Sequence, residues 1–380
     1  MVRPQAAAAL LAPLAVLGLA APAAADPQTF FMFGDSYSDT GFVLGSGSPS
    51  AANPFGNPAL PVPFSNNGPN WLKQLAVEYN SSEYIVWDLA KASATVDNDL
   101  VEVRSSVPSF TEQIEDLFLP NFGDRTASAY ANWTDDAIFG VWFGINDATM
   151  SFTKADTAEL YLEISDRYWS LVETLYVLGA RRFFFNLVPA LWLGPTGYSE
   201  EVRVREHDAI VRFNELVVER LVLFREAHPD VQTVYVDMSV LFEEMLRDYR
   251  TLGFATNDTY CEAYKAGTAA VDTWNSSCPY PVDKYFWLND VHVTSTAHRY
   301  IAQAVALALE AIGLPTTFSA ENATVGAGAI VAGDAPAGTS SAPLAAATGT
   351  ATATARTAGA AASAAAALAK PFAKTFLVQS

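Results

Sequence analysis

The sequence predicts an α/β fold in which a mostly parallel, five-stranded sheet is covered by helices on both faces. Short, nearly continuous apolar runs rich in Phe, Val and Ile alternate with longer segments in which apolar residues recur at i, i+3, i+4 and i+7. Strands that are apolar on both sides and joined by helices are typical of parallel sheets buried between two helical layers. The five predicted strands are residues 28–33, 83–89, 137–143, 181–188 and 231–237.

The helical segments lie between and after these strands. Two long amphipathic patterns cover residues 158–180 and 200–227, and a final one covers residues 294–311. In open parallel sheets the functional site gathers beyond the carboxyl ends of the strands. Polar residues just after the strands are therefore the candidates for chemistry.

The two ends of the chain differ in composition from the 26–318 segment, which we expect to be one globular domain. Residues 1–25 combine Arg3, a short apolar run and three final alanines, which is typical of a secretory signal peptide. A buried N-terminal helix is the alternative. Residues 319–380 are rich in Ala, Gly, Ser and Thr, and we expect a low-complexity, flexible tail that is open to O-glycosylation.

The tail also allows a second interpretation, a glycolipid-anchor signal, which requires an apolar end. Lys370 and Lys374 interrupt the final segment and argue against it. We therefore expect a secreted, extracellular protein without stable membrane insertion.

Other features agree with secretion. The two cysteines, Cys261 and Cys278, are predicted to form a disulfide in an oxidising compartment, rather than two free thiols or half of a zinc site. Asn-x-Ser/Thr sequons, each a candidate for N-glycosylation, occur at Asn80, Asn132, Asn257, Asn275 and Asn322.

The net charge of −19 limits the possible partners. A strongly acidic surface repels phosphate backbones and anionic lipids, so nucleic acid is excluded as an expected partner. We also expect no metal and no other cofactor.

The stretch "FMFGDSYSDTG" places Ser36 directly after the first predicted strand. Ser and Asp there could simply cap a helix. Ser36 could instead be a nucleophile, and then further polar groups should follow other strand ends. They do: "FGINDAT", which includes Asn146, follows the third strand, and "NDVHVT", which includes His292, precedes the last helix. A hydroxyl, an imidazole and amide donors are the groups that acyl transfer requires.

These blocks resemble those of the SGNH, or GDSL-type, serine esterase superfamily. "FGDSYSDTG" is similar to the nucleophile block, "FGINDAT" to the Gly-x-Asn-Asp block and "NDVHVT" to the histidine block. "NNGPNWLKQLA" resembles a Gly-Pro-x-Trp segment of secreted fungal members, and the layout is similar to carbohydrate esterase family sixteen. The resemblance implies a three-layer αβα sandwich of flavodoxin type that removes acetyl groups from plant-wall oligosaccharides.

The resemblance also implies roles. Ser36 would attack the ester carbonyl and His292 would be its base. The oxyanion hole would combine the backbone N–H groups of Ser36 and Ser93 with the side-chain amide of Asn146. Asp35, Gly144 and Asp147 would support these groups.

The sequence departs from the family pattern at three positions. Ser93 stands where the family has glycine, and Val293 stands where a proline usually follows the histidine. The triad carboxylate belongs three residues before the histidine, where this chain has Asn289, while Asp290 lies two residues before it. We name Asp290 as the expected third member, with Asn289 as the alternative through its amide oxygen, as in Cys-His-Asn enzymes.

The leading hypothesis is therefore a secreted serine esterase that removes short acyl groups, acetyl first, from small esters or acetylated oligosaccharides. A lipase for longer acyl chains is the alternative within the same class. A glycan-binding relative with weakened catalysis is the alternative from a different class.

Overall fold

A computed structural model describes residues 28–57, 67–79, 84–104, 106–125, 133–314, 316 and 323–332. The predicted signal peptide, the sequons at Asn80, Asn132 and Asn322, and the tail beyond Ala332 lie outside these residues. The described part of the chain contains no helix that is both long and apolar enough to cross a bilayer.

The predicted α/β fold class is confirmed. A single sheet has the strand order β2-β1-β3-β4-β5-β6, and the first five strands of the chain pair in parallel. Its strands are β1 (Gln28–Gly34), β2 (Tyr84–Asp88), β3 (Ile138–Trp142), β4 (Arg182–Asn186), β5 (Gln232–Val236) and β6 (Ile330–Ala332).

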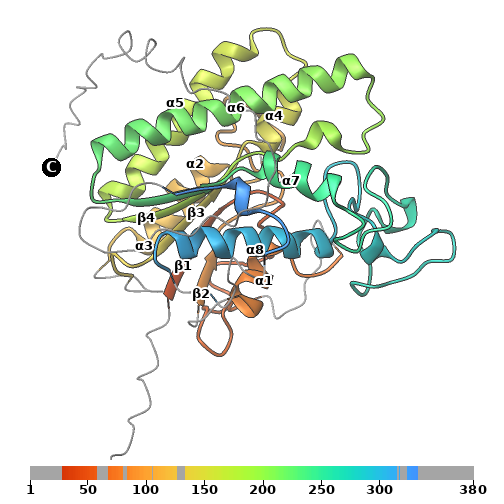
Figure 1. The fold of residues 1–380 in the computed structure, drawn as a ribbon. Coiled ribbons are helices and arrows are strands. Elements are labelled where there is room, and N and C mark those ends of the chain that lie inside the picture. Colours follow the sequence, from red (N-terminus) through yellow and green to blue (C-terminus); the bar gives the residue numbers. More distant parts are fainter. Residues whose placement is uncertain are drawn as a thin grey trace, which may run out of the picture. The chain divides into compact units, whose positions relative to one another are not determined.

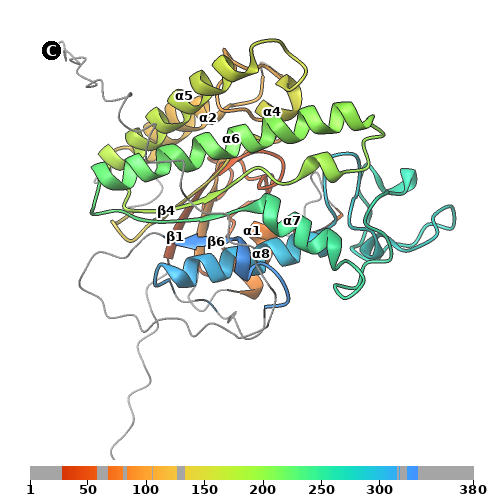
Figure 2. The ribbon, with the colours of Figure 1, turned by 45° about the horizontal axis from the view of Figure 1, so that its top comes forward.

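Helices cover both faces of this sheet (Figure 1). Figure 2 shows α2, α4, α5 and α6 on one face, with α1 and α8 on the other. The α-helices are α1 (Trp71–Glu78), α2 (Phe110–Glu112), α3 (Leu119–Phe122), α4 (Ile145–Ser151), α5 (Thr157–Val177), α6 (Glu200–Ala227), α7 (Met238–Arg247) and α8 (Ser295–Ala311). A π-helical turn, Gln113–Phe118, joins α2 to α3.

The core explains why apolar runs without alternation form these strands. Phe30, Phe31, Met32 and Phe33 in β1 are all fully buried, because both faces of this interior strand meet helices. Successive side chains point to opposite faces. The Phe31 ring therefore contacts Phe118 and Phe122, whereas its neighbour Phe30 contacts Tyr84 and Phe184.

The structure differs from the prediction at the end of the domain. Residues 330–332 were placed in the low-complexity tail, yet they form β6, which pairs antiparallel with β5 and makes the sheet six-stranded. A glycine with positive φ, Gly326, precedes this strand, and the Asp237 N–H donates to the Ala329 carbonyl. The folded domain thus extends beyond the predicted boundary at Phe318.

A long connection between α7 and α8, residues 248–294, contributes no strand to the sheet. The predicted disulfide between Cys261 and Cys278 is present within it. Its final part forms a tight turn in which Trp287 and Val293 make an antiparallel bridge and the Leu288 N–H donates to the His292 carbonyl. Val293, where the family has proline, is fully buried in this bridge.

Candidate active site

The strand order places the candidate site at one end of the sheet. Chain direction across the sheet reverses between β1 and β3, and such a switch point opens a crevice beyond the carboxyl ends of the two strands. Ser36 follows β1 by two residues, and Asn146 lies in the first turn of α4, which follows β3. The topology therefore brings the two motifs to one place.

The structure brings Ser36 and His292 together from opposite ends of the domain. The Ser36 Oγ lies 2.8 Å from Nε2 of His292, which is within hydrogen-bond distance. Ser36 is 7% exposed, so its hydroxyl is sheltered and yet reachable.

The other nitrogen of the imidazole meets Asn289. His292 Nδ1 lies 3.1 Å from Asn289 Oδ1, and that oxygen also accepts the backbone N–H groups of Val291 and His292. Because both backbone groups are donors, the amide atom that they contact must be the oxygen of Asn289. Since an amide oxygen only accepts, Nδ1 carries the proton and Nε2 has the lone pair that accepts from Ser36.

The expectation that Asp290 orients the histidine is wrong. Asp290 is exposed, and its carboxylate lies against the Tyr260 hydroxyl, whose pKa it raises. The turn that returns the chain from Leu288 to His292 directs residue 289 inward and residue 290 outward. The alternative, Asn289, occupies the position beside the imidazole.

Asn289 uses both ends of its amide. Its Nδ2 donates to the Lys265 carbonyl at 3.2 Å, which links the histidine turn to the disulfide-bonded loop. A carboxylate at this position would direct a second oxygen at that carbonyl oxygen. The asparagine therefore suits its surroundings better than the aspartate that the family pattern leads one to expect.

The protein environment keeps the imidazole neutral. Burial lowers the pKa of His292 from 6.5 to about 4. Among the described residues Nδ1 meets the amide of Asn289 and no carboxylate, so the cation lacks a partner there that would raise this pKa. The ring is thus ready to accept a proton over most of the pH range.

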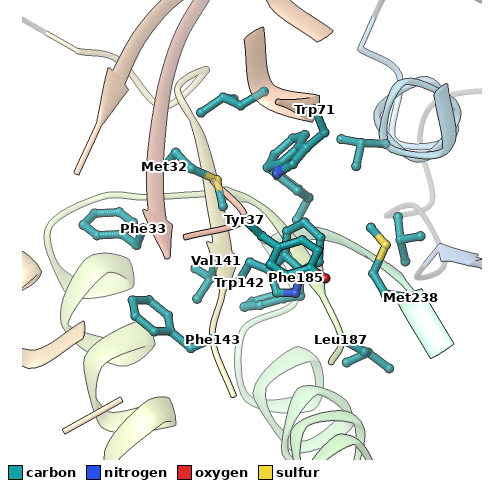
Figure 3. Close-up of a cluster of buried hydrophobic side chains, with 14 of the residues drawn as sticks. Met32, Phe33, Tyr37, Trp71, Val141, Trp142, Phe143, Phe185, Leu187 and Met238 are labelled. Atoms are coloured by element: carbon teal, nitrogen blue, oxygen red, sulfur yellow. The ribbon is translucent and has the colours of Figure 1, made fainter. Parts of the chain in front are cut away.

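Tyr37 joins the serine and histidine segments directly. Its hydroxyl donates to the Val291 carbonyl at 2.6 Å, and its ring lies between those of His292 and Trp142. Figure 3 shows Tyr37 within a cluster of buried side chains that includes Trp71 and Trp142. The residue after the candidate nucleophile therefore anchors the histidine turn to the core.

The candidate oxyanion donors Ser93 and Asn146 come from the loop after β2 and from the start of α4. Ser93 has φ +74°, the left-handed conformation that glycine adopts easily and other residues rarely adopt. Ser93 therefore keeps the backbone conformation that a glycine would adopt at this position. Asn146 Nδ2 donates to the Ala94 carbonyl at 2.8 Å, which orients the amide and leaves its second N–H for a ligand.

Carboxylates hold this loop in place. Backbone N–H groups of the loop are accepted by Asp88 (from Ala90, 3.1 Å), Asp39 (from Ala92, 2.9 Å) and Asp147 (from Val96, 3.0 Å). Asp88 ends β2, Asp39 lies in the nucleophile loop after β1, and Asp147 lies in α4 after β3, so the three come from different segments. The expected supporting role of Asp147 thus has a specific geometry, and Asp39 and Asp88 were not anticipated.

The structure explains the residue type at positions 35 and 144 in two different ways. Asp35 is fully buried, its Oδ1 accepts from the Tyr37 N–H, and burial raises its pKa to about 8. The group beside Ser36 is therefore neutral below that pH and does not oppose a developing oxyanion. Gly144 has φ +110°, and a side chain there would meet the Phe213 ring, so only glycine fits.

His298 is a further buried group that the sequence did not suggest. It lies in α8 against the Tyr37 ring, and burial lowers its pKa to about 3. A histidine within a helix and a tyrosine beside the candidate nucleophile carry no signal in the sequence for such a contact. For Asp88 a signal was available, since it is the last residue of a strand, and Asp39 lies within the nucleophile block itself.

Within the described residues, no group of three or more His, Cys, Asp or Glu side chains is arranged to hold a metal ion. The site combines a serine hydroxyl, hydrogen-bonded to an oriented imidazole, with amide donors at the switch point of a sheet between two helical layers. This is the arrangement of a serine hydrolase.

Comparison with known proteins agrees with this class. Residues 30–305 match the family model described as GDSL-like lipase/acylhydrolase. The chain belongs to this family of carboxylic ester hydrolases, so the predicted superfamily and enzyme class are confirmed.

Individual relatives were also found. The chain is 31% identical over 292 residues to an acetylesterase of Thermothelomyces thermophilus, covering 74% of this chain and 89% of that protein. A GDSL esterase/lipase of Arabidopsis thaliana is 24% identical over 192 residues, covering 44% and 49% of the two chains. Among solved structures, a variant of an acetyl xylan esterase from Geobacillus stearothermophilus has a TM-score of 0.41 at 15% identity, covering 77% and 97%.

Proposed function

We propose that this protein is a secreted serine esterase that removes short acyl groups, acetyl first, from carbohydrates of the plant cell wall. The observation that carries the proposal is the chain of contacts Ser36 Oγ–His292 Nε2–Nδ1–Asn289 Oδ1, with distances of 2.8 and 3.1 Å at its two ends. This chain is the one that activates a serine hydroxyl in acyl transfer.

In the first half of the reaction, Ser36 Oγ attacks the ester carbonyl carbon while its proton moves to His292 Nε2. The carbonyl oxygen becomes an oxyanion, which accepts from the N–H groups of Ser36 and Ser93 and from the Asn146 amide. One such donor contributes about 2.7–4 kcal/mol to the transition state. The tetrahedral intermediate then expels the alcohol, which takes the proton from Nε2, and an acyl-serine remains.

In the second half, water attacks the acyl-serine and gives its proton to the same nitrogen. Collapse of the second intermediate releases the carboxylic acid, and Ser36 recovers its proton. Asn289 Oδ1 accepts from the Nδ1–H group throughout, which keeps Nε2 directed at the reacting atoms.

The preference for acetyl esters is supported by the relative named acetylesterase, which covers most of both chains. The carbohydrate part follows from the resemblance to carbohydrate esterase family sixteen. A lipase for longer acyl chains would use the same centre, so the length of the acyl group has to be measured.

Secretion is supported by the composition of residues 1–25, the sequons and the disulfide. The two described sequons differ in access. Asn275 is exposed, whereas Asn257 is half-buried with Nδ2 donating to the Leu246 carbonyl. We therefore expect Asn275 to carry a glycan more fully than Asn257.

Hydrolysis of 4-nitrophenyl acetate tests the proposal. The wild type should hydrolyse it, and Ser36→Ala should reduce kcat by about 10⁴-fold or more. Esters from acetate to decanoate then separate an acetylesterase from a lipase. Binding of acetylated xylan without any turnover would favour the glycan-binding alternative.

A further inference from the structure

We propose that a pocket beside the histidine turn binds the alcohol half of the substrate, a polyhydroxylated sugar. This inference rests on the proposed function and adds the place and chemistry of its leaving-group site. The pocket has a volume of about 470 Å³. Pro195, Gly197 and Arg203 line one wall, and four residues of segment 258–262 line the other.

The pocket adjoins the catalytic turn on two sides. Tyr260, which lines it, interacts through its hydroxyl with Asp290, two residues before His292. Gly194, which precedes the wall formed by Pro195, packs so closely that a side chain there would lie 3.3 Å from the Asp290 carbonyl oxygen. Figures 1 and 2 show segment 248–294 extending beyond the end of the sheet beside the start of α6.

The position of the imidazole in the proposed reaction determines where the alcohol leaves. His292 protonates the leaving oxygen, so the alcohol departs next to the imidazole. The acyl oxygen instead points at the Ser93–Asn146 side, where the donors are. A site next to the histidine turn therefore meets the alcohol half of the ester.

The lining suits hydroxyl groups better than other ligands. Arg203 donates through Nη1 to the Trp192 and Gly194 carbonyls, and among the contacts of the described residues its Nε and Nη2 donors stay open. Asp258 and Glu262 supply carboxylate acceptors: Asp258 Oδ1 accepts from the Thr256 hydroxyl and Glu262 Oε1 pairs with Lys265, so each has its other oxygen for a ligand. Tyr260, whose hydroxyl faces Asp290, can still accept through its oxygen. A site that offers both donors and acceptors suits hydroxyl groups, which donate and accept.

Other ligand classes fit poorly. The two carboxylates outnumber the one guanidinium of the lining and would oppose the binding of a phosphate. An acyl chain would leave these polar groups without partners, which is unfavourable. The cross-link between Cys261 and Cys278 begins within segment 258–262 and restrains this wall.

The test compares two acetyl esters that differ in their alcohol. For each variant, kcat/KM is measured with 4-nitrophenyl acetate and with acetylated xylo-oligosaccharides, and the ratio of oligosaccharide to nitrophenyl ester is taken. The double variant Asp258→Ala/Glu262→Ala should lower this ratio at least about tenfold, since hydrogen bonds to charged groups are lost only for the sugar. Melting followed by circular dichroism checks folding, and Asp258→Asn/Glu262→Gln serves if the alanine variant is unfolded.

A matched control lies in another pocket of about 440 Å³, where Asp99 and Glu163 are likewise exposed. Asp99→Ala/Glu163→Ala should leave the ratio within about twofold, as for ordinary surface substitutions. An unchanged ratio in the Asp258/Glu262 variants would overturn the sugar site while leaving the esterase intact. The same holds if the wild type cleaves only the nitrophenyl ester. Cleavage of neither ester would overturn the proposed function itself.

Discussion

The two halves of the candidate site are built by different means. The serine side, residues 28–41, 88–96 and 144–147, stands on strand ends and is fixed by the sheet and by buried carboxylates. The histidine side, residues 255–294, contributes nothing to the sheet and is held by a turn, a disulfide and the amide of Asn289.

Because of this difference, we expect substitutions on the two sides to affect stability and activity differently. On the serine side Ser36 and the carboxylates that hold the neighbouring loop are buried, so most substitutions there should lower both. On the histidine side a half-exposed loop determines where the base lies, so substitutions can reduce activity with little effect on unfolding. The following changes test that separation.

The largest effect is expected on the histidine side. Asn289→Ala should lower kcat/KM by about 10³–10⁴-fold, because the imidazole loses the group that fixes its tautomer. Asp290→Ala, a neighbouring exposed side chain, should lower it no more than about threefold. Steady-state hydrolysis of 4-nitrophenyl acetate measures both, and similar losses would remove Asn289 from the mechanism.

On the serine side, Asn146→Ala should lower kcat by about 10²–10³-fold through loss of an oxyanion donor. It should also lower the melting temperature, because the bond to the Ala94 carbonyl disappears. Kinetics and thermal melting on the same samples decide this. A kinetic loss without any change in melting would mean that the serine side is less integrated with the core than we infer.

A pH profile tests the proposed roles of Ser36, His292 and Asn289. Since only neutral imidazole can act as the base, wild-type kcat/KM should fall only as the pH approaches about 4. Asn289→Asp places a negative charge beside His292 and should move this acid limb upward by about 1–3 pH units. An unmoved limb would show that another group controls it.

Stability should also depend on pH, in the opposite sense to that of most proteins. Burial raises the pKa of Asp35 to about 8 and the pKa values of Asp88 and Asp147 to about 7. Between pH 6.5 and 8 the unfolded chain has already ionised these carboxyl groups and its histidines lose their remaining protons. The folded state therefore binds more protons, and stability falls as the pH rises to 8. Melting temperatures across this range measure the fall, and Asp35→Asn should make it shallower.

The smallest expected change concerns Ser93. A left-handed non-glycine residue carries about 1–2 kcal/mol of strain, partly offset by the greater freedom of glycine in the unfolded chain. Ser93→Gly should therefore raise the free energy of unfolding by no more than about 1 kcal/mol, whereas Ser93→Val should lower it. Urea unfolding distinguishes the two, and a clear loss for glycine would contradict the strain.

How far the sequence could predict this site follows from the same contrast. Ser36 and Asn146 could be placed because strand ends of a parallel sheet converge, and that rule needs only the pattern of strands. The choice between Asn289 and Asp290 depended on which way each side chain points from a tight turn, and neighbouring positions in a turn look alike in sequence. Strand β6 was missed because three residues in an Ala/Gly-rich segment have no periodicity to read.

The two-sided bonding of Asn289 also has a consequence for how such sites can change over evolutionary time. A lineage that acquired aspartate here would gain a counter-ion for the imidazolium, but the new oxygen would face the Lys265 carbonyl. The benefit would appear only after the neighbouring loop had shifted, so the two changes are epistatic. An intermediate with only the first change would be selected against wherever the loop still holds its present position.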